Sequence, residues 1–504
     1  MRESRHTVII GAGPAGLTAA YELARHGYAV TVLEADPTYC GGISRTVQYK
    51  GFHFDIGGHR FFSKSERVEA LWREILPNDF LERPRSSRIY YDGKFFAYPL
   101  RPLQALWNLG LLESLRCILS YAAIRLNPIR KPRNFEEWVT NQFGARLYRI
   151  FFKTYTEKVW GMSCTEISAD WAAQRIKGVS LVSAVWNALR PTQQANSKNN
   201  KTTIKSLINT FRYPRLGPGM LWDACAAKIR AHGGTVRLGC TVTALTQEPN
   251  GQWSVHHTNA DGRHETSSAD HIVSSAPLRE IVGSTTPAFP DAAAKAANRL
   301  SYRDFLTVAV ILRDRGTFDD NWIYVHDSSV KVGRIQNFKS WSPEMVPDPS
   351  LTCYGLEYFC FEGDGLWESS DTDLADRAMR ELEQLGLASR ADFVDACVVR
   401  QKKAYPVYDD AYAANVQVVR DAIASHYPGL HLVGRNGMHK YNNQDHAMMT
   451  GLLVAENILA GSPVHDPWRV NEDAEYHEEV RSSHAPAREY HGASGLRAVP
   501  TRAS

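Results

Sequence analysis

A glycine-rich turn near the N-terminus constrains the fold more than any other feature of this 504-residue chain. Gly11, Gly13 and Gly16 form G-x-G-x-x-G between an apolar run at 7–10 and an Ala/Leu-rich stretch, and a second apolar run follows at 29–33. This order and spacing predict a βαβ unit. In such a unit the first glycine permits a tight turn, the second lets the backbone approach a pyrophosphate, and the third lets helix and strand pack closely.

The residues around this turn suit a nucleotide. Glu34 ends the second predicted strand and could accept hydrogen bonds from a ribose diol. The predicted helix begins at Pro14 and Ala15, and its first turn would offer free N–H groups and the positive end of the helix dipole to phosphates. We therefore expect a dinucleotide site, with turn glycines of purely structural origin as the alternative.

Composition excludes several other classes of protein. The chain is 43% hydrophobic and 22% charged, as in ordinary globular proteins, and its length predicts two or three packed subdomains. The net charge of +4 is small, and Lys and Arg are spread along the chain, so we expect no nucleic-acid partner. The eight cysteines form no C-x-x-C pair, so we expect reduced thiols and no metal site.

Two observations bear on location. Five mostly polar or charged residues lead directly into the first predicted strand, which leaves no room for a signal peptide, so we expect a cytoplasmic protein. The most apolar later stretch, 103–126, is interrupted by Glu113, Arg116 and Arg125 and is not expected to span a bilayer. We expect its amphipathic pattern to cover a core, with peripheral contact to a membrane surface as the alternative.

The motifs that follow the second predicted strand favour FAD over NAD. They are E-A-D at 34–36, a glycine pair at 41–42 followed by I-S-R, and D-I-G-G-H at 55–59. This pattern resembles the second phosphate-binding turn of the glutathione-reductase-like flavoproteins, which include amine oxidases, protoporphyrinogen oxidases and UDP-galactopyranose mutases. The resemblance implies that FAD is held by Gly11, Gly13, Pro14, Ala15, Gly16, Glu34, Ala35, Gly41, Gly42, Ser44, Gly58, His59, Val242, Gly434, Arg435, Gln444 and Asp445.

Within that resemblance three of these positions have stated roles. Val242 would meet the adenine through its backbone, and Gly434 and Arg435 would lie beside the flavin. For His59 we expect a hydrogen bond at the flavin side, with a structural histidine as the alternative.

We predict an α/β fold in which a Rossmann-like FAD-binding domain carries an inserted helical subdomain and a substrate subdomain with a mixed or antiparallel sheet. Strands are expected at 235–238, 307–312 and 352–361, and helices at 220–232 and 447–459. The predicted segments are an FAD-binding βαβ segment at 1–65, a mainly helical substrate subdomain at 66–211, a return to the FAD-binding domain at 212–285, a sheet-containing substrate subdomain at 286–425, a closing FAD-binding segment at 426–461 and a mostly disordered tail at 462–504. The polar stretch 191–205 is expected to form a lid or mobile loop.

Later segments narrow the family. The segments FFKTYTEKVWGMSCTEISADWAAQRI at 151–176, LSYRDFLTV at 300–308, AYPVYD at 404–409 and GRNGMHKYNNQDHAM at 434–448 resemble those of UDP-galactopyranose mutases. Two departures bear on the nucleotide and the sugar. That family usually has a second arginine after the Arg-Ile, where this chain continues K-G-V-S, and Tyr-Asp-Met where this chain has N-N-Q at 442–444.

The resemblance implies a mutase that interconverts the pyranose and furanose forms of a nucleotide-activated sugar, with reduced flavin as the nucleophile. It implies an external flavin reductant, and an oligomer is compatible with it. Arginine suits a diphosphate because its guanidinium binds two oxygens at once, and aromatic faces stack on uracil and sugars. The implied catalytic residues are His59, Arg303 and Tyr441, and the implied substrate-binding residues are Phe152, Tyr155, Trp160, Arg175, Tyr405 and Arg435.

Two alternatives stay open. The first is an FAD-dependent oxidoreductase of the protoporphyrinogen oxidase or amine oxidase type, which would produce peroxide or a reduced acceptor with each product. The second is a flavin-binding protein without catalysis. Each aromatic residue taken alone is more often a core residue than a ligand.

Overall fold

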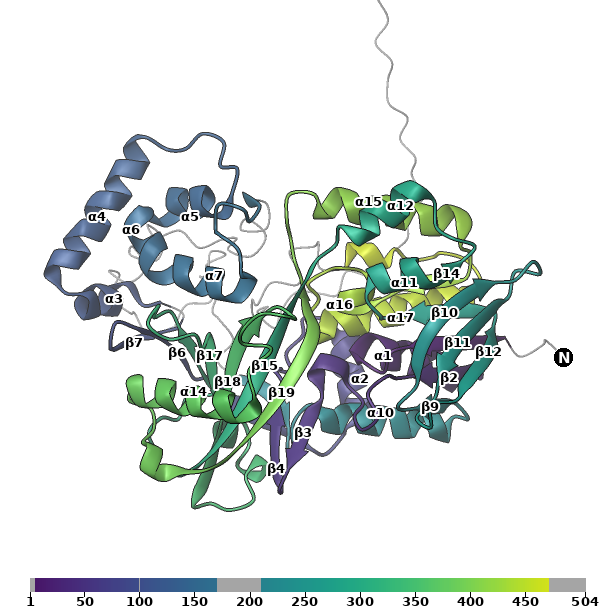
Figure 1. The fold of residues 1–504 in the computed structure, drawn as a ribbon, viewed down its shortest axis with the longest axis horizontal. Coiled ribbons are helices and arrows are strands. Elements are labelled where there is room, and N and C mark those ends of the chain that lie inside the picture. Colours follow the sequence, from purple (N-terminus) through teal and green to yellow (C-terminus); the bar gives the residue numbers. More distant parts are fainter. Residues whose placement is uncertain (1–4, 99, 170–209, 471–504) are drawn as a thin grey trace, which may run out of the picture.

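The computed structural model describes residues 5–98, 100–169 and 210–470. Figure 1 shows a Rossmann-like half on the right, beside a half that is built on a second large sheet and capped by helices. The predicted α/β class with these three parts is confirmed. Arg175, the stretch 191–205 and the tail from residue 471 lie outside the described residues.

The Rossmann half begins with the predicted βαβ unit, observed as β1 (His6–Ile10), α1 (Pro14–Arg25) and β2 (Ala29–Leu33). The five strands of its parallel sheet lie in the order β20-β13-β1-β2-β9, the further strands being β9 (Thr235–Arg237), β13 (His271–Ser274) and β20 (Leu430–Leu432). Because both faces of this sheet are covered, β1 is apolar at successive positions. Ile9 packs in the core with α1, α10 (Gly219–Ala231) and α17 (Gln444–Ala460), whereas Val8 and Ile10 pack in the core on the opposite face.

A smaller sheet covers that opposite face. Its strands are β12 (His264–Ala269), β11 (Trp253–Thr258), β10 (Thr241–Gln247) and β14 (Thr285–Thr286), in this spatial order. The predicted strand at 235–238 and the predicted helices at 220–232 and 447–459 are observed within one to three residues of the expected bounds.

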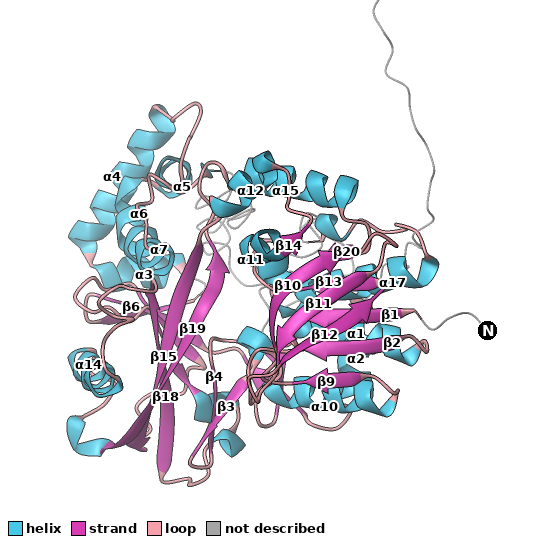
Figure 2. Ribbon diagram, turned by 45° about the vertical axis from the view of Figure 1, so that its right-hand side comes forward, coloured by secondary structure: helices cyan, strands magenta, loops and turns pink. Residues whose placement is uncertain are grey.

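The second half is built on a seven-stranded mixed sheet with the order β19-β15-β18-β17-β16-β6-β7. Its bounds are β6 (Ser87–Tyr91), β7 (Lys94–Ala97), β15 (Tyr302–Arg313), β16 (Trp322–Val325), β17 (Arg334–Asn337), β18 (Leu351–Cys360) and β19 (Phe393–Pro406). Figure 2 shows α14 (Asp371–Gln384) on the outer face of the long strands, away from the Rossmann half. Even-numbered residues of β15 such as Leu306 pack with α14, and odd-numbered ones such as Phe305 point to the inner face.

The remaining elements connect these parts. They are α2 (Glu66–Ile75), β3 (Thr46–Tyr49), β4 (Phe52–Asp55), β5 (Phe80–Pro84), β8 (Thr210–Pro214), α11 (Leu278–Ser284), α12 (Asp291–Asn298), α13 (Phe338–Trp341), α15 (Tyr412–His426) and α16 (Gly434–Gly437).

The helical cap consists of α3 (Pro102–Leu109), α4 (Leu111–Leu126), α5 (Phe135–Phe143), α6 (Ala145–Tyr148) and α7 (Thr154–Trp160). The segment predicted as mainly helical also holds β6 and β7, which join the large sheet. Between them Asp92 and Gly93 both have positive φ (49° and 71°), as a two-residue hairpin turn requires. The D-G pair in the sequence was the signal for this hairpin. The bounds of the predicted segments stay predictions.

The expectation that the apolar residues of 103–126 cover a core is wrong in part. The stretch 103–126 covers a core with only one side, where Ala105, Ser114 and Cys117 are buried. Its large apolar residues face outward, and Leu111 is 94% exposed. Among the described residues, no helix has the length and apolar character that crossing a bilayer requires.

Candidate functional site

The glycine turn follows β1, and two of its glycines are required by the protein itself. Gly11 has φ 96°, which favours glycine, and a Cβ there would collide with Ser275. A Cβ on Gly16 would collide with the carbonyl oxygen of Gly11, so this glycine permits the close packing of α1 on β1. Both roles are those that the spacing predicts.

Gly13 is different, because nothing in the protein requires a glycine there. Its φ of −78° suits any residue, and the nearest atom to an added Cβ would be the Cα of Gly42, 4.0 Å away. This contact between two facing glycines lies at the N-terminus of α1, where free N–H groups and the helix dipole favour an anion. Because neither residue has a side chain, the backbone here could be approached closely by a pyrophosphate.

Glu34 is held in place beside the glycine turn. Its carboxylate accepts hydrogen bonds from the backbone N–H of Ala12 at 2.6 Å and of Asp36 at 2.9 Å, and burial raises its pKa. Each carboxylate oxygen can accept a second hydrogen bond, so the fixed side chain could still receive a ribose hydroxyl.

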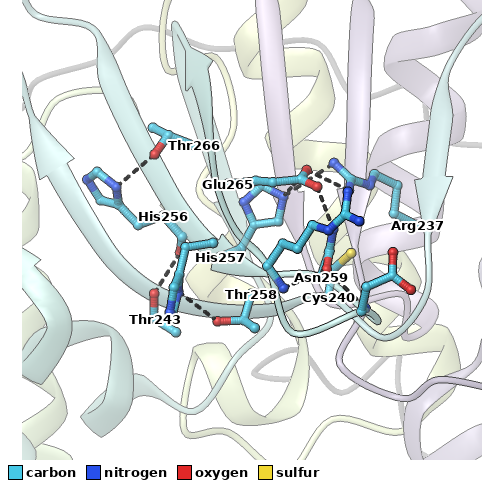
Figure 3. Close-up of polar contacts among 12 residues, drawn as sticks. Arg237, Cys240, Thr243, His256, His257, Thr258, Asn259, Glu265 and Thr266 are labelled. Atoms are coloured by element: carbon cyan, nitrogen blue, oxygen red, sulfur yellow. Dashed lines mark hydrogen bonds and ion pairs between the residues drawn. The ribbon is translucent and has the colours of Figure 1, made fainter.

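A group of charged and polar side chains lies beside the start of β10, on β9, β11 and β12 and the turn between the last two (Figure 3). Glu265 pairs with Arg237 at 2.6 Å, accepts from Asn259 at 2.6 Å and lies 3.7 Å from the buried His257. Arg237 also accepts a hydrogen bond at its carbonyl from the N–H of Glu34 at 2.9 Å. This group thus links the parallel sheet to the smaller sheet. Sequence reasoning missed it, although R at the end of one strand and H and E on two others were visible.

Val242 lies at the start of β10, and its predicted backbone contact with adenine stays a prediction. Val242 pairs with His257 of β11, and the register of this pairing shifts between Val242 and Ala244. On the other edge of β10, β14 pairs only with Leu245 and Thr246. Among the described strands, none pairs with β10 beside Val242 on that edge.

The N-terminus of α17 brings several predicted cofactor residues together. Ser44 donates to Gln444 at 3.1 Å, and Gln444 donates to the carbonyl of Arg60 at 3.0 Å. Asp445 accepts from Ser63 at 3.1 Å. Two glycines let the elements approach: a Cβ on Gly434 would lie 3.0 Å from the Cβ of Ala15, and one on Gly451 would collide with the carbonyl of Ala15. The predicted residues therefore meet where α1, α16 and α17 converge.

His59 lies half-buried after the glycine pair that follows β4. Its Nε2 is 3.4 Å from the carbonyl oxygen of Ile56. Burial and the positive charge of Arg435 lower the pKa of His59 to about 4. The imidazole is therefore neutral at neutral pH and can either donate or accept a hydrogen bond, but does not supply a positive charge.

An aromatic cluster with one arginine lies beside these residues. The rings of Tyr405 and Tyr441 stack with centroids 5.6 Å apart, and the indole of Trp160 lies 6.5 Å and 6.2 Å from them. The guanidinium carbon of Arg435 lies 5.3 Å and 4.8 Å from the two tyrosine centroids. Its nitrogens donate to the carbonyls of Asn442 and Ala404 at 3.0 Å and 3.1 Å, which fixes the cation against the rings. The structure thus brings together three predicted substrate-binding residues, Trp160 of α7, Tyr405 of β19 and Arg435 of α16, with the predicted catalytic Tyr441 from the loop before α17.

Three other predicted residues lie around this cluster. Tyr155 stacks on His326 at 4.8 Å, and Phe152 stacks on Phe143 at 5.0 Å within the cap. Arg303 of β15 is buried, and its guanidinium donates to the carbonyl of Phe359 at 2.9 Å. The guanidinium of Arg303 also packs against Gly161, the residue after α7, where an added Cβ would collide with it. This geometry favours a positioning role for Arg303, which braces the turn after Trp160.

A buried polar group on the inner face of the large sheet was missed. Arg334 pairs with Glu357 through Nε at 2.9 Å and Nη2 at 2.5 Å, and Gln336 donates to Glu357 at 2.7 Å. Glu357 and Gln336 are fully buried. Burial raises the pKa of Tyr155 and Tyr405, and the positive charge of Arg334 opposes this rise. The signal in the sequence was the single carboxylate of Glu357 within an apolar strand, because such a group needs a partner.

Gln336 has one unpaired atom. Within the described part of the chain, its buried Oε1 has no hydrogen-bond partner, and it lies 3.6 Å from the position that a Cβ on Gly58 would take. A buried acceptor without a partner costs free energy unless a ligand or water supplies a donor. The unpaired Oε1 of Gln336 near Gly58 is therefore compatible with a bound group that donates a hydrogen bond there.

The buried His326, which stacks on Tyr155, should make the stability of the protein depend on pH. Burial and the nearby Lys158 lower the pKa of His326 to about 3, compared with about 6.5 in an unfolded chain. As pH falls below 6.5 the unfolded chain takes up this proton first, so folding stability is lost. We expect the free energy of unfolding of His326→Phe to fall less between pH 6.5 and pH 4, by up to about 3 kcal/mol. Urea titrations at each pH measure this difference.

The control is the exposed His426, since His426→Gln should keep the pH dependence of the parent chain. An equal loss of stability between pH 6.5 and pH 4 in the parent and in His326→Phe would show that His326 is not kept neutral in the folded protein. Phenylalanine was chosen because it keeps the stacking on Tyr155.

Comparisons with known proteins agree with this geometry. The model of the family described as flavin containing amine oxidoreductase matches residues 14–459. A crystal structure of reduced UDP-galactopyranose mutase matches with a TM-score of 0.77 at 23% identity, over 93% of this chain and 99% of that chain. This likeness shows the fold.

Two curated relatives carry different names. A probable UDP-galactopyranose mutase of Klebsiella pneumoniae is 29% identical over 178 residues, which are 33% of this chain and 44% of that protein. This chain thus matches less than half the length of that relative. The mitochondrial protoporphyrinogen oxidase of Nicotiana tabacum is 22% identical over 498 residues, 91% of this chain and 95% of that protein.

Proposed function

Because this chain belongs to the flavin-containing amine oxidoreductase family, we propose that it is an FAD-dependent mutase. Its substrate would be a nucleotide-activated sugar, whose pyranose and furanose forms it would interconvert with the flavin reduced. The single observation that supports this most is the stacked pair Tyr405 and Tyr441 with Arg435 fixed against both rings.

This cluster combines what a nucleotide sugar needs. A diphosphate requires fixed positive charge, which Arg435 offers because two of its nitrogens are already anchored on carbonyls. The indole of Trp160 and the ring of Tyr155 offer flat faces for a base or for the apolar face of a sugar. Substrate-binding roles for Phe152 and Arg175 stay predictions.

The cofactor is proposed to be FAD, because a dinucleotide accounts for the glycine at position 13, the fixed carboxylate of Glu34 and the unpaired acceptor of Gln336. When bound and reduced, FAD would supply the electron-rich nucleophile that attacks the anomeric carbon. The chain itself would hold the diphosphate, orient the sugar and exclude water. The neutral His59 would accept or donate a hydrogen bond at the flavin side, and Tyr441 would place its hydroxyl near the leaving group.

Turnover stoichiometry tests the proposal. Purified holoprotein reduced by dithionite, under anaerobic conditions, should convert at least one member of a panel of nucleotide sugars with no oxidant consumed. The oxidised protein should be inactive, since the flavin would be electron-poor. An external reductant in the cell is part of this proposal.

The alternative is an oxidase, which the match over almost the whole length of a protoporphyrinogen oxidase favours. Such an enzyme would start from oxidised flavin, lose its yellow colour on meeting substrate and yield peroxide or reduced acceptor. Bleaching by an unactivated substrate, without prior reduction, would contradict the mutase proposal and leave the flavin site in place.

A further inference from the structure

The cap carries a continuous apolar surface that the proposed reaction does not use. On α4 the exposed residues Leu111, Leu112, Leu115, Ile118, Leu119 and Leu126 form what we call the apolar stripe. Trp107 of α3, 87% exposed, extends it. Monomeric proteins rarely leave so many large apolar side chains together in water, so this surface has an occupant. Figure 1 shows α4 at the outer edge of the molecule, on the side away from the Rossmann half.

The stripe has the geometry of a helix that lies flat in an interface. At about 100° of rotation per residue, its six members fall within an arc of roughly 120° on α4. Arg125 and Arg116 follow at the two borders of this arc. The buried Cys117 lies on the opposite side, and the buried Ser114 lies just beyond the border at Arg125, so the helix packs on the cap with this side. Long cationic side chains at both borders can keep their charge in water while the apolar side chains are immersed.

Charge favours one kind of occupant. From Arg101 to Arg133 the chain has six cationic residues and one acidic residue, Glu113. That carboxylate is already engaged by Arg116 and Arg146. An apolar arc with a cationic border matches a bilayer surface that contains anionic lipids, where acyl chains receive the leucines and headgroups receive the arginines.

A second copy of the chain fits this surface less well. A two-fold interface would bring the stripe of one copy onto the same stripe of the other. The cationic borders would then face each other with Glu113 as the one carboxylate of α4, and like charges at an interface are unfavourable.

We propose that α4 and the end of α3 dock on a membrane surface that contains anionic phospholipid, with the apolar stripe immersed at the level of the headgroups. The docking needs no membrane-spanning helix. It does not depend on the reaction that the flavin site performs.

Flotation with lipid vesicles tests this docking on the FAD-loaded full chain. The parent should bind vesicles of phosphatidylcholine with phosphatidylglycerol at least tenfold more tightly than vesicles of phosphatidylcholine alone. Replacing Leu111, Leu115 and Ile118 together by serine should lower binding at least tenfold. Because these side chains are exposed, the variant should keep its flavin content. Failure of the parent to bind the anionic vesicles, or full binding by the serine variant, would overturn the proposal.

Two further variants separate charge from apolar character. The control replaces Val394, Val418 and Val464, which are exposed apolar residues elsewhere on the surface, by serine and should float like the parent. Replacing Arg125, Arg130 and Lys131 by glutamine should weaken binding and reduce its sensitivity to salt. If the parent instead dimerises in sedimentation experiments through the stripe and ignores vesicles, a second copy is the occupant and the membrane proposal is wrong.

Discussion

Gly13→Val should fold like the parent chain and purify almost without flavin. The backbone should accept valine, because φ at this position is −78° and the nearest atom to an added Cβ is at an ordinary contact distance of 4.0 Å. The valine methyl groups would instead occupy the N-terminus of α1, where we expect the pyrophosphate to bind. We expect less than about a tenth of the parent's flavin content, since a bulky group cannot be accommodated against phosphates held by a helix N-terminus.

Gly283→Val is the matched control. Gly283 lies in α11 with no atom within 4 Å of an added Cβ, and its φ lies outside the positive range. It therefore tests the loss of a glycine without the loss of a binding site. Absorption at 450 nm relative to 280 nm measures flavin content, and circular dichroism checks the fold. A full yellow spectrum for Gly13→Val would show that the phosphates bind elsewhere.

The nucleotide half was predictable because its signals are local. Gly11 follows from its backbone angle and Gly16 from a short distance within one βαβ unit, and the predicted strands and helix are observed within a residue or two. The aromatic cluster around Tyr405 could be predicted only through the resemblance, since its members come from three separate elements.

Other features depend on distant parts of the chain. The pairing of Arg334 with Glu357 follows from the register of β17 and β18, which sequence spacing does not reveal. The exposure of Leu111 depends on which side of α4 packs against the cap. Amphipathic periodicity shows that a helix has an apolar side, but not whether protein, lipid or another chain covers it.

Glu357→Ala should lower the free energy of unfolding by roughly 3 to 5 kcal/mol. The substitution removes the only carboxylate that Arg334 is paired with in the described residues, and leaves a largely buried guanidinium without a counter-charge. It also removes the acceptor for Gln336. Chemical denaturation of the parent and the variant measures the change. As a control, Asp376→Ala breaks a pair in which both partners are about half exposed, and should cost less than about 1 kcal/mol.

Removing both charges separates stability from function. The double variant Arg334→Met, Glu357→Leu contains no uncompensated charge, so it should recover most of the stability that Glu357→Ala loses. Turnover should nonetheless be low in the double variant, because Arg334→Met removes the positive charge that acts on the hydroxyls of Tyr155 and Tyr405. If the double variant had both the stability and the activity of the parent, the ion pair would contribute only to packing in the sheet and not to turnover. If it regained neither, the loss in Glu357→Ala would come from packing and not from the unpaired charge.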